Sequence, residues 1–305
     1  MTANEIDLSV TIAGVKLRNP VIAASGCFGY GREYSGLLDI AGLGGICTKG
    51  LTLAGRPGNQ GTRLHETPSG LMNSIGLENP GIEAFIENEL PGLRKLGPAV
   101  IANLSGSTTD EYVRGARLLD SSDIDMIELN ISCPNVKAGG MSFGLDPDIA
   151  AAVTLSVRRA APDKPLMVKL SPNAPDLNAV ANSCAAAGAD AISLVNTFKA
   201  LAIDIGKRKP VFDNISAGLS GPAIRPIALR MVWELYDAVN IPIVGMGGIA
   251  SAESALEFLL AGAAAIQVGS ASFAHPPLMS EIIAGIGNYM KENRFSEINQ
   301  LSIRR

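Results

Sequence analysis

A chain of 305 residues with 47% hydrophobic and 18% charged residues can bury a large core without a disulfide or a metal. The net charge of −4 argues against a nucleic-acid partner, and the one basic run, at residues 207–209, is short enough to be an exposed loop. No segment has the pattern of a secretion signal or the roughly 18 apolar residues of a membrane helix, so a cytoplasmic protein is expected.

The first predicted element is a β-hairpin over residues 7–18, where apolar and polar residues alternate on both sides of Gly14. After it, short and mostly apolar runs recur along the chain at residues 21–24, 45–48, 99–103, 126–130, 166–170, 191–196, 243–245 and 264–268. Runs of this kind are typical of parallel strands that are buried on both faces.

Segments with helical periodicity separate these runs. Thr108 precedes one of them as a helix cap, Ser251 precedes another, and Pro222 and Pro226 lie near the start of a third. The alternation predicts an α/β fold, namely a closed (β/α)8 TIM barrel with a short N-terminal β-hairpin. No linker-like stretch divides residues 1–305, so a single domain is expected.

Glycine and polar residues follow nearly every apolar run, in chain order Ser25-Gly26, Lys49-Gly50, Asn103, Asn130 with Cys133, Lys169, Asn196-Thr197, Gly247-Gly248 and Gly269-Ser270. In a parallel barrel these positions meet at one rim, where catalysis occurs. The segments GMGGI (245–249) and QVGS (267–270) favour a phosphate site over simple tight turns, because glycine lets backbone N–H groups approach an anion.

Two residues of this rim have distinctive chemistry. Lys169 ends an apolar strand. Three roles are open for it: a surface residue, a Schiff-base nucleophile, or a fixed positive charge for an anionic cofactor. Cys133 follows a strand on a loop with the Gly139-Gly140 pair, where a thiol can act as a nucleophile or a general base.

The remaining cysteines and the histidines offer no metal or hydrolase site. Cys27, Cys47 and Cys184 have no CxxC spacing, so inert thiols are expected in place of a disulfide framework, a zinc site or an iron–sulfur cluster. His65 and His275 are isolated, which argues against a Cys–His hydrolase.

Asparagine recurs at strand ends and in the segment NSIGLENPG, at Asn73, Asn79, Asn103, Asn130, Asn135 and Asn196. Amide side chains donate and accept hydrogen bonds, so they match a planar substrate with alternating C=O and N–H groups. Asparagine is also a common turn residue, and this explanation fits Asn79 best.

Together these segments resemble the dihydroorotate dehydrogenase family. The resemblance spans nearly the whole chain, through TKGLT (48–52), NSIGLENPG (73–81), ANLSG (102–106), ELNISCPN (128–135), VKLSPN (168–173), VNT (195–197), GLSGPAIRPIALRMV (218–232), GMGGI (245–249) and QVGS (267–270). It implies an FMN-binding barrel that oxidises dihydroorotate to orotate in pyrimidine biosynthesis, with no metal.

The resemblance also implies roles for individual residues. FMN contacts are expected at Ser25, Lys49, Gly50, Asn103, Asn130, Lys169, Val195, Gly221, Gly247, Gly248, Gly269 and Ser270. The pyrimidine is expected against Lys49, Asn73, Ser74, Ile75, Gly76, Leu77, Asn130, Asn135, Asn196 and Thr197. Cys133 would be the base that removes the C5 proton while hydride leaves C6, and Lys169 would stabilise the reduced flavin.

A cysteine base without a membrane-associating extension resembles the soluble class 1 enzymes, and IDIGKRKPVF (203–212) resembles their NAD-linked class 1B branch. That branch implies a homodimer of this chain within a heterotetramer, whose partner subunit carries FAD and a [2Fe–2S] cluster. The alternatives are a fumarate-dependent class 1 enzyme, a related FMN barrel acting on uracil or dihydrouracil, a non-redox phosphate-binding barrel and an inactive scaffold.

Overall fold

The computed structural model describes residues 6–132 and 143–304. Its centre is a closed barrel of parallel strands, in chain order β3 (Val21–Ala23), β4 (Gly45–Cys47), β9 (Ala99–Leu104), β10 (Met126–Asn130), β11 (Leu166–Lys169), β12 (Ala191–Leu194), β17 (Ile243–Met246) and β18 (Ala265–Val268). Every strand pairs with the next, and β18 pairs with β3 to close the ring. The predicted (β/α)8 barrel is confirmed, with a strand at each of the predicted apolar runs.

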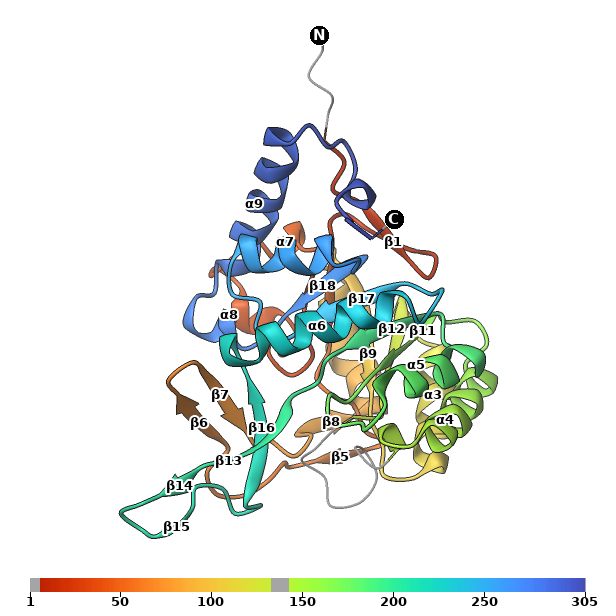
Figure 1. The fold of residues 1–305 in the computed structure, drawn as a ribbon. Helices are drawn as coiled ribbons and strands as arrows, with labels where there is room; N and C mark the ends of the chain where they lie inside the picture. The colour runs from red at the N-terminus through yellow and green to blue at the C-terminus, as the bar shows by residue number, and fades with distance from the viewer. Residues whose placement is uncertain (1–5, 133–142, 305) are drawn as a thin grey trace.

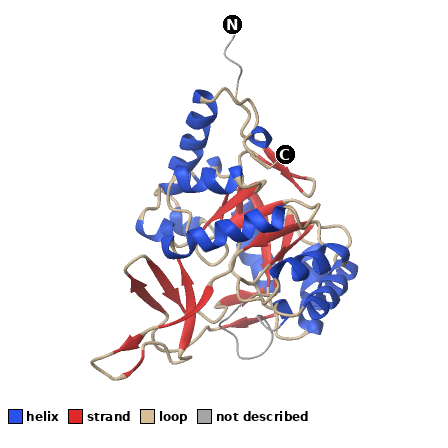
Figure 2. Cartoon of the chain, viewed as in Figure 1, coloured by secondary structure: helices blue, strands red, loops and turns tan. Residues whose placement is uncertain are grey.

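Helices surround the barrel, as Figures 1 and 2 show. The longer ones are α3 (Thr109–Asp120), α4 (Pro147–Ala160), α5 (Leu177–Ala186), α6 (Arg225–Tyr236), α7 (Ala252–Leu260) and α9 (Leu278–Glu292). The shorter helical segments are η1 (Arg32–Tyr34), η2 (Ile40–Gly42), α1 (Ile82–Ala84), η3 (Phe85–Glu89), α2 (Leu90–Arg94), η5 (Pro222–Ile224), α8 (Ala271–Ala274) and η6 (Ile298–Gln300). Within residues 6–132 and 143–304, no helix is both long and apolar enough to cross a membrane.

The predicted helix starts are confirmed. The Thr108 side chain accepts a hydrogen bond from the backbone N–H of Glu111 at the start of α3, and Ser251 caps α7 in a reciprocal arrangement with Ser254. These bonds satisfy backbone donors that have no partner within the helix. Pro226 occupies the first turn of α6, where its missing N–H removes no helical hydrogen bond.

The predicted N-terminal hairpin is also present, formed by β1 (Val10–Ile12) and β2 (Val15–Leu17). Its Ile12 and Leu17 side chains are buried against the apolar residues that point inward from the N-terminal part of the barrel strands, such as Met126 and Met167. The hairpin therefore covers the end of the barrel that is opposite to the predicted catalytic rim.

At the other end, connections between barrel strands build further sheets that the apolar runs did not predict. A four-stranded antiparallel sheet contains β6 (Leu64–Thr67), β7 (Gly70–Asn73), β13 (Phe198–Leu201) and β16 (Ser216–Ser220). Two smaller pairs are β5 (Ala54–Arg56) with β8 (Asn79–Gly81), and β14 (Ile203–Asp204) with β15 (Lys209–Pro210). Figure 1 shows the four-stranded sheet extending from the barrel on the side away from both termini. The basic run at 207–209 is exposed in the β14–β15 hairpin, as expected.

The barrel interior changes from apolar to polar along the strands. Successive inward positions are two residues apart, because side chains alternate across a strand. On β10, apolar Met126 is followed by Glu128 and Asn130, and on β11 apolar Met167 is followed by Lys169. A buried polar layer thus lies between the apolar base and the C-terminal rim.

Candidate active site

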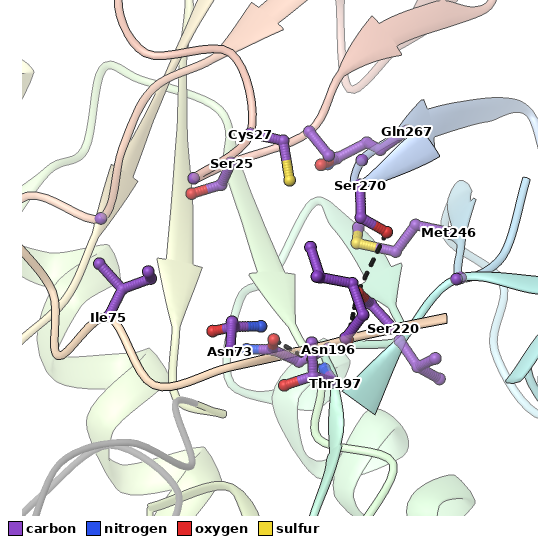
Figure 3. Close-up of a pocket in the computed structure, with 18 of the residues that line it drawn as sticks. Ser25, Cys27, Asn73, Ile75, Asn196, Thr197, Ser220, Met246, Gln267 and Ser270 are labelled. Atoms are coloured by element: carbon purple, nitrogen blue, oxygen red, sulfur yellow. Dashed lines mark hydrogen bonds between the residues drawn. The ribbon is translucent and has the colours of Figure 1, made fainter. Parts of the chain in front are cut away.

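A cavity opens at the C-terminal ends of the barrel strands. Its wall includes residues that follow β3, β4, β12, β17 and β18, and others from the four-stranded sheet. In the view of Figure 3, Asn73, Asn196 and Thr197 lie together on one side of the pocket, and Cys27 and Gln267 lie across from them. The cavity therefore has one face rich in amide and hydroxyl groups and a second face formed by the barrel.

Glu128 is the centre of the buried polar layer beneath this cavity, and its side chain is fully buried. Its Oε1 accepts hydrogen bonds from Ser193 Oγ at 2.8 Å and Gln267 Nε2 at 2.7 Å. Its Oε2 accepts from Cys47 Sγ at 3.1 Å and Asn103 Nδ2 at 2.5 Å. A carboxylate has about four lone-pair positions, so these donors satisfy the ionised form.

The charge of Glu128 is balanced by Lys169, whose Nζ lies 3.9 Å from Glu128 Oε2. Burial alone raises the pKa of Glu128, but the Lys169 charge and the hydrogen bonds from Gln267, Cys47 and Ser193 outweigh burial, so its pKa is lowered. Lys169 is itself only 5% exposed and lines the cavity. The site thus holds a fixed cation at its floor.

Gln267 connects this layer to the cavity. Its Nε2 donates to Glu128, while its Oε1 is buried and has no hydrogen-bond partner among the described residues. The residue lines the cavity and is 1% exposed. A buried acceptor without a partner is costly, so this oxygen marks a position where a bound ligand can donate a hydrogen bond.

A chain of amide hydrogen bonds runs from Glu128 to the far wall. Asn103 Oδ1 accepts from Asn130 Nδ2 at 3.1 Å, and Asn130 Oδ1 accepts from Ser132 Oγ at 3.1 Å. Ser132 Oγ in turn accepts from Asn196 Nδ2 at 2.9 Å. The chain fixes the orientation of the Asn130 and Asn196 side chains, both of which line the cavity.

A second cation lies at the cavity wall. Lys49 Nζ is 3.9 Å from Glu78 Oε1, and Glu78 also pairs with Arg63. The hydrogen bond from Arg63 and the charge of Lys49 lower the pKa of Glu78. Because Glu78 is shared between two cations, Lys49 can still attract an anionic ligand.

Glycines at the ends of β17 and β18 form the part of the wall where a phosphate was predicted. Gly247 and Gly248 have φ values of +122° and +76°, which residues with a side chain rarely adopt. Close by, Ser220 Oγ donates to Ser270 Oγ at 3.0 Å, which joins the four-stranded sheet to the loop after β18 (Figure 3). Backbone and hydroxyl groups are thus available for an anion at this rim.

The residues expected to contact FMN come together in the structure. All of them line this cavity except Asn103, which is fully buried and accepts a hydrogen bond from the wall residue Asn130. Of the residues expected to hold the pyrimidine, Ser74 does not line the cavity; its side chain accepts hydrogen bonds from Asn59 and Asn214. The expected base Cys133 and the substrate contact Asn135 lie outside the described residues.

Several residues of the cavity were not predicted from the sequence, among them Cys27, Glu78, Ser220, Met246 and Gln267. Gln267 follows Ala265 by two positions on β18, so both side chains point into the barrel, but the apolar run that predicts this strand does not show which of its faces is the inner one. The same holds for Glu128, which follows Met126 by two positions on β10.

The histidines lie outside this cavity, as far as the chain is described. His65 packs edge-on against Phe212, and His275 contacts Glu281 at 2.8 Å. Burial raises the pKa of Cys27 to about 11, so this cavity-lining thiol is protonated at neutral pH. Among residues 6–132 and 143–304, no group of His, Cys, Asp and Glu side chains has the arrangement of a metal site.

The family model and the relatives that match this chain carry the same family name. The family model described as dihydroorotate dehydrogenase matches residues 7–290. A relative from Petrotoga mobilis, named dihydroorotate dehydrogenase B (NAD(+)), catalytic subunit, is 57% identical over 97% of this chain and 98% of its own length. Relatives with the same name from Geotalea daltonii and Caldicellulosiruptor saccharolyticus are each 53% identical over 97% of this chain, and over 97% and 98% of their own lengths.

Proposed function

The chain belongs to the dihydroorotate dehydrogenase family, and from this premise we propose that it oxidises (S)-dihydroorotate to orotate with FMN as its bound cofactor. The electrons pass to NAD+ through a partner subunit, in agreement with relatives that are named catalytic subunits of an NAD(+)-linked enzyme. The reaction is a step of pyrimidine biosynthesis.

The observation that carries this proposal is the pairing of two cations with oriented amides in one cavity at the barrel rim. Lys169 at the cavity floor supports an electron-rich cofactor ring, and Lys49 at the wall supports a carboxylate. The amide and hydroxyl groups of Asn73, Asn196 and Thr197 suit the alternating carbonyl and N–H groups of a pyrimidine.

The wall also suits FMN. The unpartnered oxygen of Gln267 suits a ring N–H group, and the rim at Gly247-Gly248 and Gly269-Ser270 suits a phosphate. We assign the cofactor to Ser25, Lys49, Gly50, Asn103, Asn130, Lys169, Val195, Gly221, Gly247, Gly248, Gly269 and Ser270. Asn103 acts through Asn130.

We assign the substrate to Lys49, Asn73, Ser74, Ile75, Gly76, Leu77, Asn130, Asn135, Asn196 and Thr197. Ser74 acts indirectly, because its hydroxyl accepts from Asn59 and Asn214 and so fixes the segment between Asn73 and Ile75.

The chemical step converts the C5–C6 single bond of the substrate into a double bond. Cys133 would take the proton from C5, and FMN held by the residues assigned above would supply the hydride acceptor for C6. The residue before the cysteine, Ser132, is fully buried and hydrogen-bonded to Asn130 and Asn196, so the chain leaves β10 at the cavity wall. Lys49 and the neighbouring amides stabilise the negative charge that develops on the carbonyl beside C5.

The electron route requires a partner. We propose that a separate subunit carries FAD and a [2Fe–2S] cluster, and that a homodimer of this chain binds two such subunits. The name shared by the relatives, catalytic subunit, supports the existence of a second subunit.

The test begins with the visible spectrum of the purified chain, followed by anaerobic addition of dihydroorotate. We expect a flavin spectrum that bleaches with dihydroorotate and not with dihydrouracil. A flavin that remains oxidised in a folded protein contradicts the substrate, and bleaching by dihydrouracil favours the uracil-reducing alternative. Reoxidation by fumarate without any partner favours the fumarate-dependent branch.

A further inference from the structure

Glu128 has no role in the mechanism above, although it is a fully buried carboxylate directly beneath the cavity. It does not line the cavity; Asn130, the next inward residue on β10, does. A buried charge lowers stability unless neighbouring groups compensate it. Since Glu128 does not line the cavity, it can influence a bound ligand through two neighbours that do, Gln267 and Lys169.

The hydrogen bonds of Glu128 determine how Gln267 faces the cavity. Both carboxylate oxygens are acceptors, so the amide of Gln267 must turn its nitrogen toward Glu128 and its oxygen away. A rotated amide would place two acceptors against each other. The unpartnered Oε1 of Gln267 is therefore a consequence of the negative charge on Glu128.

Glu128 also faces Lys169 across neighbouring strands. The distance of 3.9 Å between Lys169 Nζ and Glu128 Oε2 is an ion-pair contact without a close hydrogen bond. The Lys169 ammonium group is thus held at the floor and remains available to the cavity, while the carboxylate partly cancels its field.

We propose that Glu128 is a positioning residue that orients Gln267 and Lys169 and thereby sets the relative affinity of the pocket for oxidised and reduced FMN. The inference rests on the proposed function, because it requires that FMN binds here. Reduced FMN carries more negative charge than oxidised FMN, so it gains from Lys169 and loses from Glu128. The charge of Glu128 therefore holds the flavin potential below the value that Lys169 alone would give.

The test is the midpoint potential of bound FMN in the wild type and in Glu128→Gln, measured by anaerobic dye-coupled titration. We expect Glu128→Gln to favour the reduced form at least tenfold, which is a rise of about 30 mV for a two-electron couple. The matched control is Glu89→Gln, which also removes one carboxylate from an ion pair, here with Arg32, and does not line the cavity. It should keep the wild-type potential.

A folded, flavin-loaded Glu128→Gln protein with the wild-type potential overturns the inference, because a purely structural role would change stability alone. If that variant fails to fold, Gln267→Met decides, since it removes the unpartnered acceptor and leaves the other donors to Glu128 in place. A potential of bound FMN that differs from the wild-type value supports the inference, and an unchanged potential refutes it.

These outcomes are separable from a failure of the proposed function. A wild-type chain that takes up no FMN refutes both. A wild-type chain that binds FMN but is not bleached by dihydroorotate refutes only the substrate, and the potentials of the variants still test Glu128.

Discussion

At the scale of single residues, burial keeps the three thiols among the described residues protonated. Burial raises the pKa of Cys27 to about 11 and that of Cys184 to about 11. Burial and the neighbouring charge of Glu128 raise the pKa of Cys47 well above its ordinary value. These thiols stay protonated at neutral pH, so they are poor bases, and Cys47 instead serves Glu128 as a hydrogen-bond donor.

The first prediction concerns Cys133. Replacing it with alanine removes the proposed base, and flavin reduction by dihydroorotate should slow by about 10²–10⁴-fold, with FMN still bound. The measurement is anaerobic stopped-flow reduction of the enzyme-bound flavin. Cys27→Ala is the matched control, because Cys27 lines the cavity but holds its proton. An unchanged rate in Cys133→Ala would refute the base assignment.

The second prediction concerns Lys49, the cation at the cavity wall. A charged hydrogen bond contributes about 1.5–3 kcal/mol, so Lys49→Gln should weaken orotate binding by roughly 10–150-fold. The dissociation constant is measured from the change in the flavin spectrum on titration with orotate. Lys199→Gln is the control, since this lysine is exposed on strand β13 and does not line the cavity. Equal losses for orotate and for uncharged uracil would show that Lys49 does not bind a carboxylate.

At the scale of elements, the hairpin β1–β2 and the catalytic rim lie at opposite ends of the barrel. Ile12 is 1% exposed and packs on the apolar base of the barrel, while its neighbour Thr11 is exposed. Residues at this end of a barrel contribute to stability, whereas residues at the rim contribute to chemistry. The two contributions can therefore be separated by substitution.

The third prediction uses this separation. Ile12→Ala should lower the free energy of unfolding by about 2–5 kcal/mol, because it leaves a cavity in the barrel base. Thr11→Ala, one residue away on the exposed face, should change it by no more than about 0.5 kcal/mol. Urea denaturation measures both values. Folded Ile12→Ala protein should reduce its flavin at the wild-type rate, and a slower rate would show that the hairpin influences the rim.

The elements differ in how well the sequence predicts them. The barrel strands follow from local signals, because a strand buried on both faces is a continuous apolar run. The four-stranded sheet does not, since β16 has the sequence SAGLS and is half-buried, and it becomes a strand only by pairing with β7 and β13. Such pairing joins residues far apart in the chain, and a local pattern does not contain it.

In the candidate site, too, some features follow from local sequence and others depend on how strands pair. Strand-end polar residues are visible in the sequence because strand ends are visible. The inward direction of Glu128 and Gln267 depends on the register of β10 and β18, and the continuous apolar runs that predict these strands do not specify which face points inward. The substrate follows from the resemblance of the motifs to one family and not from the polar pattern itself.

At the scale of the whole molecule, the stability of the barrel is coupled to its ligand. The apolar base is closed by the hairpin. Among the described residues, the amide oxygen of Gln267 at the polar floor has no hydrogen-bond partner, and Lys169 has an ion-pair contact of 3.9 Å with Glu128. A ligand that satisfies these groups binds only the folded chain, so it stabilises folding by mass action. The unfolding temperature is therefore a measure of how well the cavity and the cofactor match.

The fourth prediction follows from this coupling and from the glycine rim at Gly247-Gly248 and Gly269-Ser270. FMN at about 100 times its dissociation constant should stabilise the flavin-free chain by about 2.7 kcal/mol, and the unfolding temperature should rise by a few degrees in calorimetry. Riboflavin at the same concentration offers the ring to Lys169 and Gln267 but no phosphate to the rim, so its effect should be clearly smaller. Because both ligands share the ring, the difference between them reports the phosphate site alone. Equal stabilisation by FMN and riboflavin would place the binding energy in the ring and contradict a phosphate site at these glycines.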